Sequence, residues 1–180
     1  MLENLIKLLL YYKSLGEKSF ESLSDEELHL IPGDGSNSIP TIVKHLWGNM
    51  MSRWTNFLTE DGEKDWRDRE GEFEITIKNR DELIVKWEEG WSCFLGAIQN
   101  LNKDDLNRTV YIRNEGHTVI DAIHRQLAHY SYHIGQIVYL AKIIKGDDWK
   151  SLSIPKGETE KYNQEKFSKE KDAKHFTDEV

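Results

Sequence analysis

Two histidines of this sequence, His129 and His133, stand four residues apart inside a long stretch with helical periodicity. Residues at positions i and i+4 lie one above the other on the same face of a helix, so both imidazoles point to the same side. Neutral imidazole binds Zn²⁺, Ni²⁺, Cu²⁺ and Fe²⁺, and a pair of this kind can supply two nitrogen ligands to one metal ion. The spacing therefore predicts a divalent metal site that needs at least one more ligand.

A third histidine, His45, borders the apolar face of another predicted helix, as the first two border theirs. If these two helices pack together, all three imidazoles reach one point of a helical bundle. Three protein ligands leave positions for water, which is typical of catalytic rather than closed structural metal sites. Amide side chains on the same stripes are candidates for hydrogen bonds to the histidines or to a substrate: Asn49, Gln126 and Gln136.

A second interpretation of the histidine pair is structural, because HxxxH also occurs by chance on helices and histidine is often a half-buried polar residue. The sequence assigns no general acid or base, since Asn49 and Gln136 can orient a ligand but cannot shuttle protons as carboxylates do. Cys93, the single cysteine, has no motif of a nucleophile and is expected to be a small buried hydrophobe. The catalytic residues are therefore left unassigned.

The histidine pair is positioned by the helix predicted from Thr118 to Lys145. Thr118 and Asp121 form an N-terminal capping signal, and Gly146 can adopt the left-handed conformation that ends a helix. Apolar side chains recur at spacings of three and four along it and predict a core-facing stripe. This stripe is made of Ile120, Ile123, Leu127, Tyr130, Ile134, Ile137, Ala141 and Ile144.

Three other helices are predicted by the same periodicity, over about residues 2–23, 39–58 and 80–101, with Ser38 and Asn79 as caps of the second and third. Gly48 lies inside the second of them at a cost of roughly 1 kcal/mol and indicates close approach of another element, most simply a neighbouring helix. Residues 73–77 alternate in polarity and predict one short extended segment, and residues 109–119 predict a hairpin with its turn at 114–116. The predicted fold class is all-α, a four-helix bundle with a short β-hairpin before the last helix.

Length and composition narrow the class of protein. A chain of 180 residues predicts one domain, here a bundle over residues 1–150 followed by a charged tail over residues 151–180. A net charge of −8 without a basic cluster argues against nucleic acid as a partner. No run approaches the roughly 20 apolar residues that span a bilayer, and the N-terminal stretch lacks a signal-peptide cleavage site. One cysteine fits a reducing compartment, so we expect a cytoplasmic protein that binds neither membrane nor nucleic acid.

The run from His129 to Gln136 has the pattern HxxxHxGQ, and it is combined with the lone His45 in the second helix. This combination resembles the DinB/YfiT-like superfamily of metalloenzymes over about residues 1–150. Two longer stretches, SIPTIVKHLWGNMMSRWTNFLTEDGEKDW and RNEGHTVIDAIHRQLAHYSYHIGQIVYLAK, are similar to its DUF1572 branch. The resemblance implies that superfamily's variant of up-and-down bundle topology, frequent dimers, and Zn or Ni bound by His45, His129 and His133.

The function expected from these observations is that of a metal-dependent enzyme. The resemblance includes enzymes that transfer low-molecular-weight thiols, while an open metal site also suits hydrolysis, so both transferase and hydrolase activity on a small molecule stay open. The alternative is a non-catalytic module in which the metal stabilises a dimer or binds a ligand. We expect a homodimer with two-fold symmetry, because six tryptophans and seven tyrosines offer more apolar surface than one bundle hides.

Overall fold

Four long helices form the bundle of the computed structural model, which describes residues 2–179. They are α1 (Leu2–Glu21), α3 (Ile39–Trp54), α4 (Arg80–Gln99) and α5 (Val119–Lys145). Two shorter helices are α2 (Asp25–Leu28) and α6 (Thr159–Phe167), and the strands β1 (Thr109–Ile112) and β2 (Glu115–Thr118) form an antiparallel hairpin before α5. The all-α class and the hairpin are thus as the sequence predicts.

The starts of three long helices are fixed by side-chain caps. The side chains of Ser38, Asn79 and Thr118 accept hydrogen bonds from backbone amides of the first turns of α3, α4 and α5. At the other end of α5, Gly146 has φ +53°, a conformation that costs glycine little. The predicted capping residues are therefore confirmed, and α5 has the length that the capping signals indicate.

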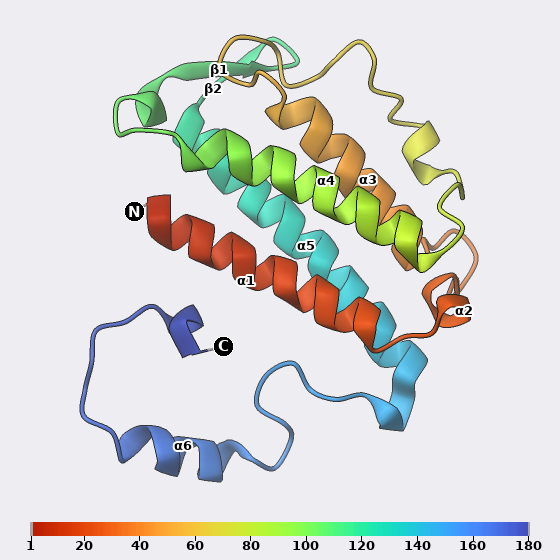
Figure 1. The fold of residues 1–180 in the computed structure, drawn as a ribbon, viewed down its shortest axis with the longest axis vertical. Coiled ribbons are helices and arrows are strands. Elements are labelled where there is room, and N and C mark those ends of the chain that lie inside the picture. The colour runs from red at the N-terminus through yellow and green to blue at the C-terminus, as the bar shows by residue number, and fades with distance from the viewer. Residues whose placement is uncertain (1, 180) are drawn as a thin grey trace.

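The four long helices run in two parallel pairs. Helices α3 and α4 point in the same direction, opposite to α1 and α5 (Figure 1). Helix α3 packs against both α4 and α5, and α1 packs against α5 and α4. Because α3 and α4 are parallel, their connection over residues 55–79 must return along the whole length of the bundle, and Figure 1 shows it doing so on the outer side of α3. Side chains of this return segment contact His45, as described below.

Aromatic rings fill the core between α3, α4 and α5. Trp91, Phe94 and Tyr130 are fully buried, with ring centroids 5.2–6.1 Å apart, and Tyr130 lies edge to face with both of the other rings. Trp54 Nε1 donates to the Tyr130 hydroxyl over 3.0 Å and that hydroxyl donates to Asn49 Oδ1 over 3.2 Å, whereas Nε1 of Trp91 is buried without a hydrogen-bond partner among residues 2–179. Burial strongly raises the pKa of Tyr130, so the hydroxyl stays protonated and can donate.

Two boundaries differ from the sequence-based expectation. Helix α3 ends at Trp54 rather than near residue 58, because Asn56 takes a left-handed conformation with φ +50° and breaks the helix. The hairpin turn lies at Arg113 and Asn114, both with positive φ, so that residues 115 and 116 belong to β2. Positive φ at both central residues matches the twist of a two-residue hairpin, and the Asp61 carboxylate accepts hydrogen bonds from both turn amides.

The short extended segment predicted over residues 73–77 does not form a strand. The structure has a single 3₁₀ turn there, η1 (Gly71–Phe73), and no strand between residues 60 and 79. The alternation of polar and apolar residues does not predict burial in this segment. The acidic Glu72 is only 3% exposed, whereas the apolar Ile75 is 65% exposed. Glu72 is buried because its carboxylate has buried partners, as described below.

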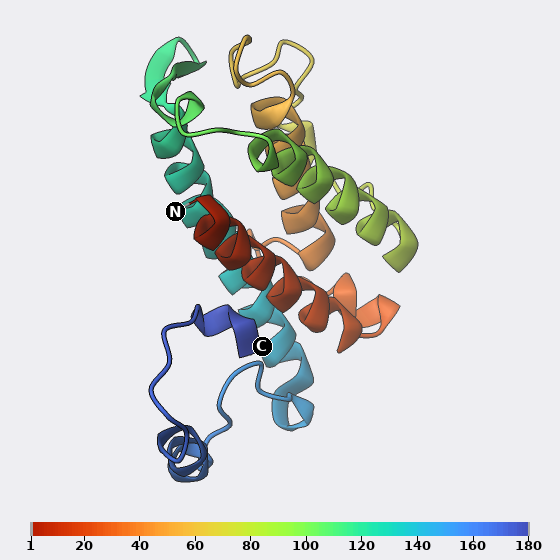
Figure 2. The same ribbon diagram turned by 60° about the vertical axis from the view of Figure 1, so that its left-hand side comes forward.

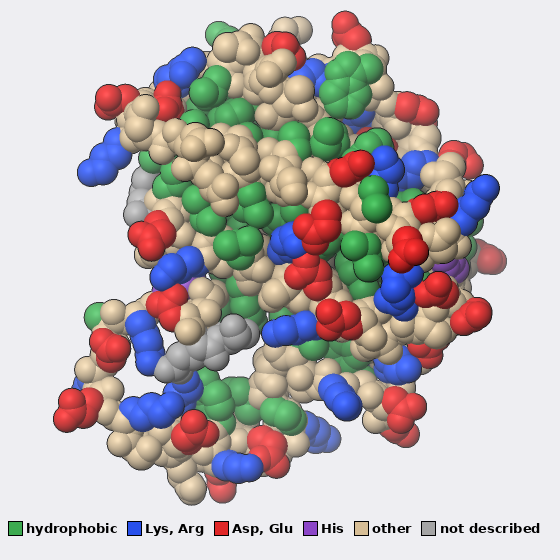
Figure 3. Space-filling model, viewed as in Figure 1, with side chains coloured by type: hydrophobic (Ala, Val, Ile, Leu, Met, Phe, Trp, Pro, Cys, Tyr) green, Lys and Arg blue, Asp and Glu red, His purple; other side chains and the backbone are tan. Residues whose placement is uncertain are grey.

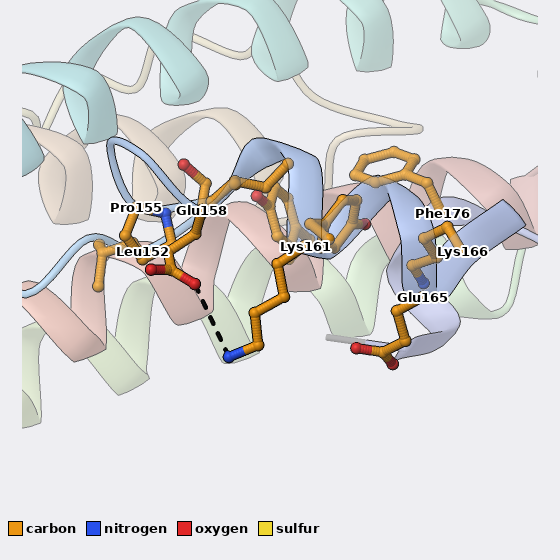
Figure 4. A pocket seen from close by; sticks show the side chains of 11 residues that line it. Leu152, Pro155, Glu158, Lys161, Glu165, Lys166 and Phe176 are labelled. Carbon is orange, nitrogen blue, oxygen red and sulfur yellow. Dashed lines mark ion pairs between the residues drawn. The ribbon is translucent and has the colours of Figure 1, made fainter. Parts of the chain in front are cut away.

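The C-terminal residues after α5 form a separate layer beside α1 (Figure 2). Their end is held by an ion pair between Lys7 Nζ and Asp178 Oδ1, 2.7 Å long, and by a ring contact between Tyr11 and Phe176. Between this layer and α1 lies a cavity of about 720 Å³, lined by Tyr11 and residues of the tail (Figure 4). This cavity shares no residue with the histidine cluster.

Charges of both signs intermix on the face of the molecule that Figure 3 shows. Lysine and arginine side chains lie among aspartate and glutamate over the face seen in Figure 3, without a broad basic area. No helix within residues 2–179 has the length and apolar character that a membrane span needs.

Candidate metal centre

The structure brings His45, His129 and His133 together at the interface of α3 and α5. The Nε2 atom of His129 lies 3.4 Å from Nε2 of His45 and 3.1 Å from Nε2 of His133. One ring nitrogen from each histidine falls within 4.8 Å of the others, close enough for all three to bind one metal ion. His45 is buried and the other two are partly buried, so the cluster is covered on one side and reachable on the other.

The spacing of these nitrogens fits a bound cation. Nitrogens that bind a tetrahedral ion at about 2.1 Å are roughly 3.4 Å from each other, close to the observed separations. His45 and His133 each use Nδ1 in a hydrogen bond to an oxygen acceptor, so in the neutral rings their Nε2 atoms carry lone pairs. A neutral His129 has a single ring proton, which it can donate to the Nε2 lone pair of either His45 or His133. At least one of these lone pairs therefore points to the centre of the cluster without a hydrogen-bond donor. A divalent cation would satisfy this donor set.

Glu72 orients His45 from the return segment. Nδ1 of His45 donates to Glu72 Oε2 over 2.8 Å. Burial alone would raise the pKa of Glu72, but hydrogen bonds from His45 and Arg67 outweigh it and lower that pKa below its usual range. An ionised carboxylate can only accept, so it fixes the proton of His45 on Nδ1 and leaves Nε2 free for a metal, as in carboxylate–histidine–metal sites.

Arg67 holds the same carboxylate from the other side. Its Nε donates to Glu72 Oε1 over 2.7 Å and its Nη2 to Glu72 Oε2 over 3.1 Å, a side-on bidentate pair that is almost completely buried. A third bond joins Arg67 Nη1 to Glu63 over 3.2 Å. The chain Glu63–Arg67–Glu72–His45 therefore links the return segment to the candidate metal ligands.

Gly48 makes room for this carboxylate. A β-carbon at position 48 would lie 2.7 Å from Cδ of Glu72 and would overlap its Oε1 atom. The close approach that the glycine indicates is thus made by the Glu72 side chain, and the interpretation as a neighbouring helix is wrong. Only glycine leaves room for the Glu72 carboxylate at position 48, so α3 keeps a glycine there despite its cost in helix stability.

Gln136 and Phe73 contact the other sides of His133 and His45. Nδ1 of His133 donates to Gln136 Oε1 over 2.7 Å, which leaves Nε2 of His133 facing the centre. The ring of Phe73 stacks on His45 with centroids 5.3 Å apart and planes 25° from parallel. The side chains around the centre therefore fix the orientation of two of the three imidazoles.

His129 and His133 are held neutral by their surroundings. Burial, followed by the neighbouring imidazoles and the charges of Arg53 and Arg67, lowers the pKa of His129 to about 3. Burial also lowers the pKa of His133, although its bond to Gln136 acts in the opposite direction. Neutral imidazoles offer lone pairs without first losing a proton, which favours metal binding near neutral pH.

Two other candidate residues, Asn49 and Gln126, form no hydrogen bond with the histidines among residues 2–179. Asn49 accepts from Tyr130 and belongs to the aromatic core, where it supports α5 beside His129. Gln126, 2% exposed and one turn before His129, has an Oε1 atom without a hydrogen-bond partner among residues 2–179. Of the three amides predicted to surround the histidines, Gln136 is the one within the described residues that is hydrogen-bonded to a histidine of the cluster.

Sequence reasoning missed Glu72, Arg67 and Phe73. These residues lie in an irregular segment, so no periodicity places them on a face of a helix. The only signal in the sequence was Gly48, a glycine in the middle of a helix one turn from His45. It indicated that something approaches closely but not which residue, because the approach is made by a side chain 24 residues further along the chain.

Gln136→Ala is expected to weaken metal binding roughly tenfold or more, because hydrogen-bond partners of metal-bound imidazoles typically contribute 10–100-fold. Competition titration with a coloured chelator measures this affinity. Gln136→Glu keeps an acceptor at His133 Nδ1 and should retain binding, and Gln99→Ala, an exposed glutamine at the end of α4, is the control. Equal affinity in Gln136→Ala and the unaltered protein would show that the bond does not orient His133 for a metal.

Comparison with known families gives one match. The family model described as "Protein of unknown function (DUF1572)" matches residues 1–158, which include the whole bundle and all three histidines. No curated protein and no solved structure matches the chain.

Proposed function

Because the chain belongs to the DUF1572 family, whose description assigns no activity, we propose its function from its own geometry: a divalent-metal-dependent enzyme with His45, His129 and His133 as metal ligands. The observation that carries this proposal is the convergence of three Nε2 atoms, of which those of His45 and His133 are presented by outward bonds from Nδ1. Structural metal sites usually close their coordination with four protein ligands. Three imidazoles leave room for water or a substrate atom.

The donor set favours Zn²⁺, with Ni²⁺ as the second candidate, because neutral imidazoles suit both ions. Such an ion supplies Lewis acidity and lowers the pKa of a water or thiol that binds it, which gives a nucleophile near neutral pH. Glu72 would keep His45 in the tautomer that binds, and Gln136 would do the same for His133. The reaction classes that this arrangement supports are transfer of a small thiol and hydrolysis of a small ester or amide.

A non-catalytic, metal-dependent binding module is the second candidate, and one observation favours it. The carboxylate beside the histidines, Glu72, is already engaged by Arg67 and His45, so it is unsuited to accept a proton from a nucleophile. In this alternative the metal would bind a ligand or stabilise the fold without turnover.

The test compares zinc-loaded, nickel-loaded and chelator-stripped protein in assays of thiol transfer and of ester and amide hydrolysis. The enzyme proposal expects turnover that depends on metal and is lost in His129→Ala. Full metal occupancy without turnover in any of these assays would favour the binding module. Absence of metal binding would exclude both candidates.

We also propose a cytoplasmic homodimer that pairs through α4. Ile84 and Val85 are 41% and 53% exposed on this helix, and a symmetry-related copy would remove both apolar side chains from water. Light scattering at micromolar concentration is expected to give about twice the 21.1 kDa mass of one chain. The mass of a single chain would contradict the dimer, and Val85→Lys is expected to halve the mass if the pairing involves α4.

A further inference from the structure

A groove of about 360 Å³ lies between α5 and the loop that leads into α3. One wall is formed by side chains of α5, among them Gln136, Tyr139 and Ile143. The other is formed by Ile42 of α3 and by residues of the loop between positions 32 and 37. A volume of this size lies within the range of small-molecule sites in proteins.

The groove continues the candidate metal centre along α5. Residues of the centre and of the groove follow each other on this helix at spacings of four and three, which places them on one stripe. The stripe runs through His129, His133, Gln136, Leu140 and Ile143. The histidines therefore occupy one half of the stripe and the groove occupies the other.

The wall on α3 has the same relation to the centre. Ile42 lies three residues before His45, just as Gln136 lies three residues after His133. Because α3 and α5 run in opposite directions (Figure 1), both displacements lead to the same end of the bundle. One turn of helix is roughly 5 Å long, so one small molecule can reach from the centre into the groove.

Gln136 joins the two sites directly. Its Oε1 atom accepts a hydrogen bond from Nδ1 of His133 over 2.7 Å, and its side chain also lines the groove. The Nε2 atom of this amide donates to no residue from 2 to 179. Gln136 thus orients a candidate metal ligand with its oxygen and keeps its two N–H donors for a molecule in the groove.

The lining of the groove includes no charged side chain among the described residues. Its polar side chains carry amide or hydroxyl groups, and the others are aliphatic or proline. A charged group of a ligand would lose water in the groove without gaining an ionic partner, which is unfavourable. The lining therefore suits a neutral group.

Apolar surface of the groove is open to water. Ile42 and Leu140 are almost fully buried, but Tyr139 is 65% and Ile143 is 49% exposed. A ring or an alkyl chain that lies against the last two side chains would remove apolar surface of both partners from water. The groove is thus able to contribute affinity for the part of a substrate that does not react.

We propose that this groove binds a neutral, apolar group of the substrate, about one helical turn from the atom that reacts at the three histidines. The substrate class is an uncharged thiol, ester or amide in which a short linker joins the reacting group to an alkyl chain or an aromatic ring. This inference rests on the proposed function for the metal and deepens it by naming the substrate class.

The groove is tested first in metal-free protein, with phenethyl alcohol as the probe. The methyl NMR signals of Ile42, Leu140 and Ile143 are expected to shift together as the probe is added. Tyr139→Ala should bind the probe at least about threefold more weakly, because part of the apolar wall is lost. Tyr111→Ala is the control, since this tyrosine lies on β1, is 53% exposed and does not line the groove.

The link to the metal is tested in zinc-loaded protein by calorimetry with three thiols. Ethanethiol, phenethyl thiol and mercaptoethanesulfonate share the same thiol and two-carbon linker and differ in the group at the other end. Phenethyl thiol is expected to bind at least about tenfold more tightly than ethanethiol, because its ring leaves water. Mercaptoethanesulfonate should gain no such advantage, since its charge finds no partner in the groove.

Ile143→Lys should change this preference without changing the metal. A lysine at this half-exposed position adds a charge to the groove, so binding of phenethyl thiol should weaken and binding of mercaptoethanesulfonate should strengthen. Zinc content and binding of ethanethiol should stay as in the unaltered protein. Gln136 is left unaltered in this series, because its substitution would also act on His133.

Several results would overturn the inference. They are methyl signals that do not respond to phenethyl alcohol, a response lost equally in Tyr111→Ala, and equal binding of phenethyl thiol and ethanethiol. Shifts of the same methyl signals on dilution of the protein alone would also overturn it, because a second copy of the chain would then cover the groove. A methyl response in protein that binds no zinc would contradict the proposed metal site and support the groove.

Discussion

Protein carrying His129→Ala or His133→Ala, purified without added metal, is expected to contain less than about a tenth of the divalent metal found in the unaltered protein. Each substitution leaves two imidazoles of a three-ligand set, and loss of a ligand should exceed the 10–100-fold that loss of a hydrogen-bond partner costs. The two residues act together because their Nε2 atoms lie 3.1 Å apart. Elemental analysis after dialysis gives the number of ions per chain.

His124→Ala is the matched control, since this histidine stands on the same helix and is exposed. It should keep the metal content of the unaltered protein. If all three variants carried equal metal, the ions would be bound elsewhere and the cluster would be a set of half-buried structural histidines. Circular dichroism confirms that each variant is folded before its metal is counted.

Glu72→Ala is expected to lower the free energy of unfolding by about 3–5 kcal/mol, as removal of one partner from a buried ion pair does. Arg67 would lose its bidentate acceptor and His45 its Nδ1 acceptor, and both side chains would stay buried. Metal affinity should fall roughly 10–100-fold as well, because His45 would no longer be fixed in one tautomer. Urea unfolding of metal-free protein separates the first effect from the second.

Glu70→Ala provides the comparison for Glu72. Its side chain is 89% exposed and pairs with Arg69 over 3.2 Å, and surface pairs of this kind contribute about 0–1 kcal/mol. Glu72→Gln keeps an oxygen for His45 but removes the charge, so it should recover part of the metal affinity and little of the stability. Equal stability of Glu72→Ala and Glu70→Ala would show that the buried network does not contribute to folding.

Much of the fold could be predicted because its signals are local. The caps Ser38, Asn79 and Thr118 are marked by residue type at fixed spacing, and helical periodicity locates the stripe of α5. The pairing of His129 with His133 is a property of one helix. Adding His45 required only that α3 pack against α5, which their apolar faces favour.

The rest of the site depends on contacts that are not local. Glu72 reaches His45 because α3 and α4 are parallel and the chain must return beside α3, a feature of topology that no short pattern records. The hairpin turn also depends on a distant partner, since Asp61 binds the amides of Arg113 and Asn114.

The contact between Gly48 and Glu72 makes the residue accepted at one of these positions depend on the residue at the other. As long as residue 72 is a buried carboxylate, any side chain at position 48 collides with it, so substitutions at the two positions are not independent. Relatives that lose the acid are free to replace the glycine and regain helix propensity, whereas relatives that keep the acid are confined to glycine. Substitution at these two positions should therefore covary across the family, and their joint presence in a relative identifies the same carboxylate–histidine arrangement.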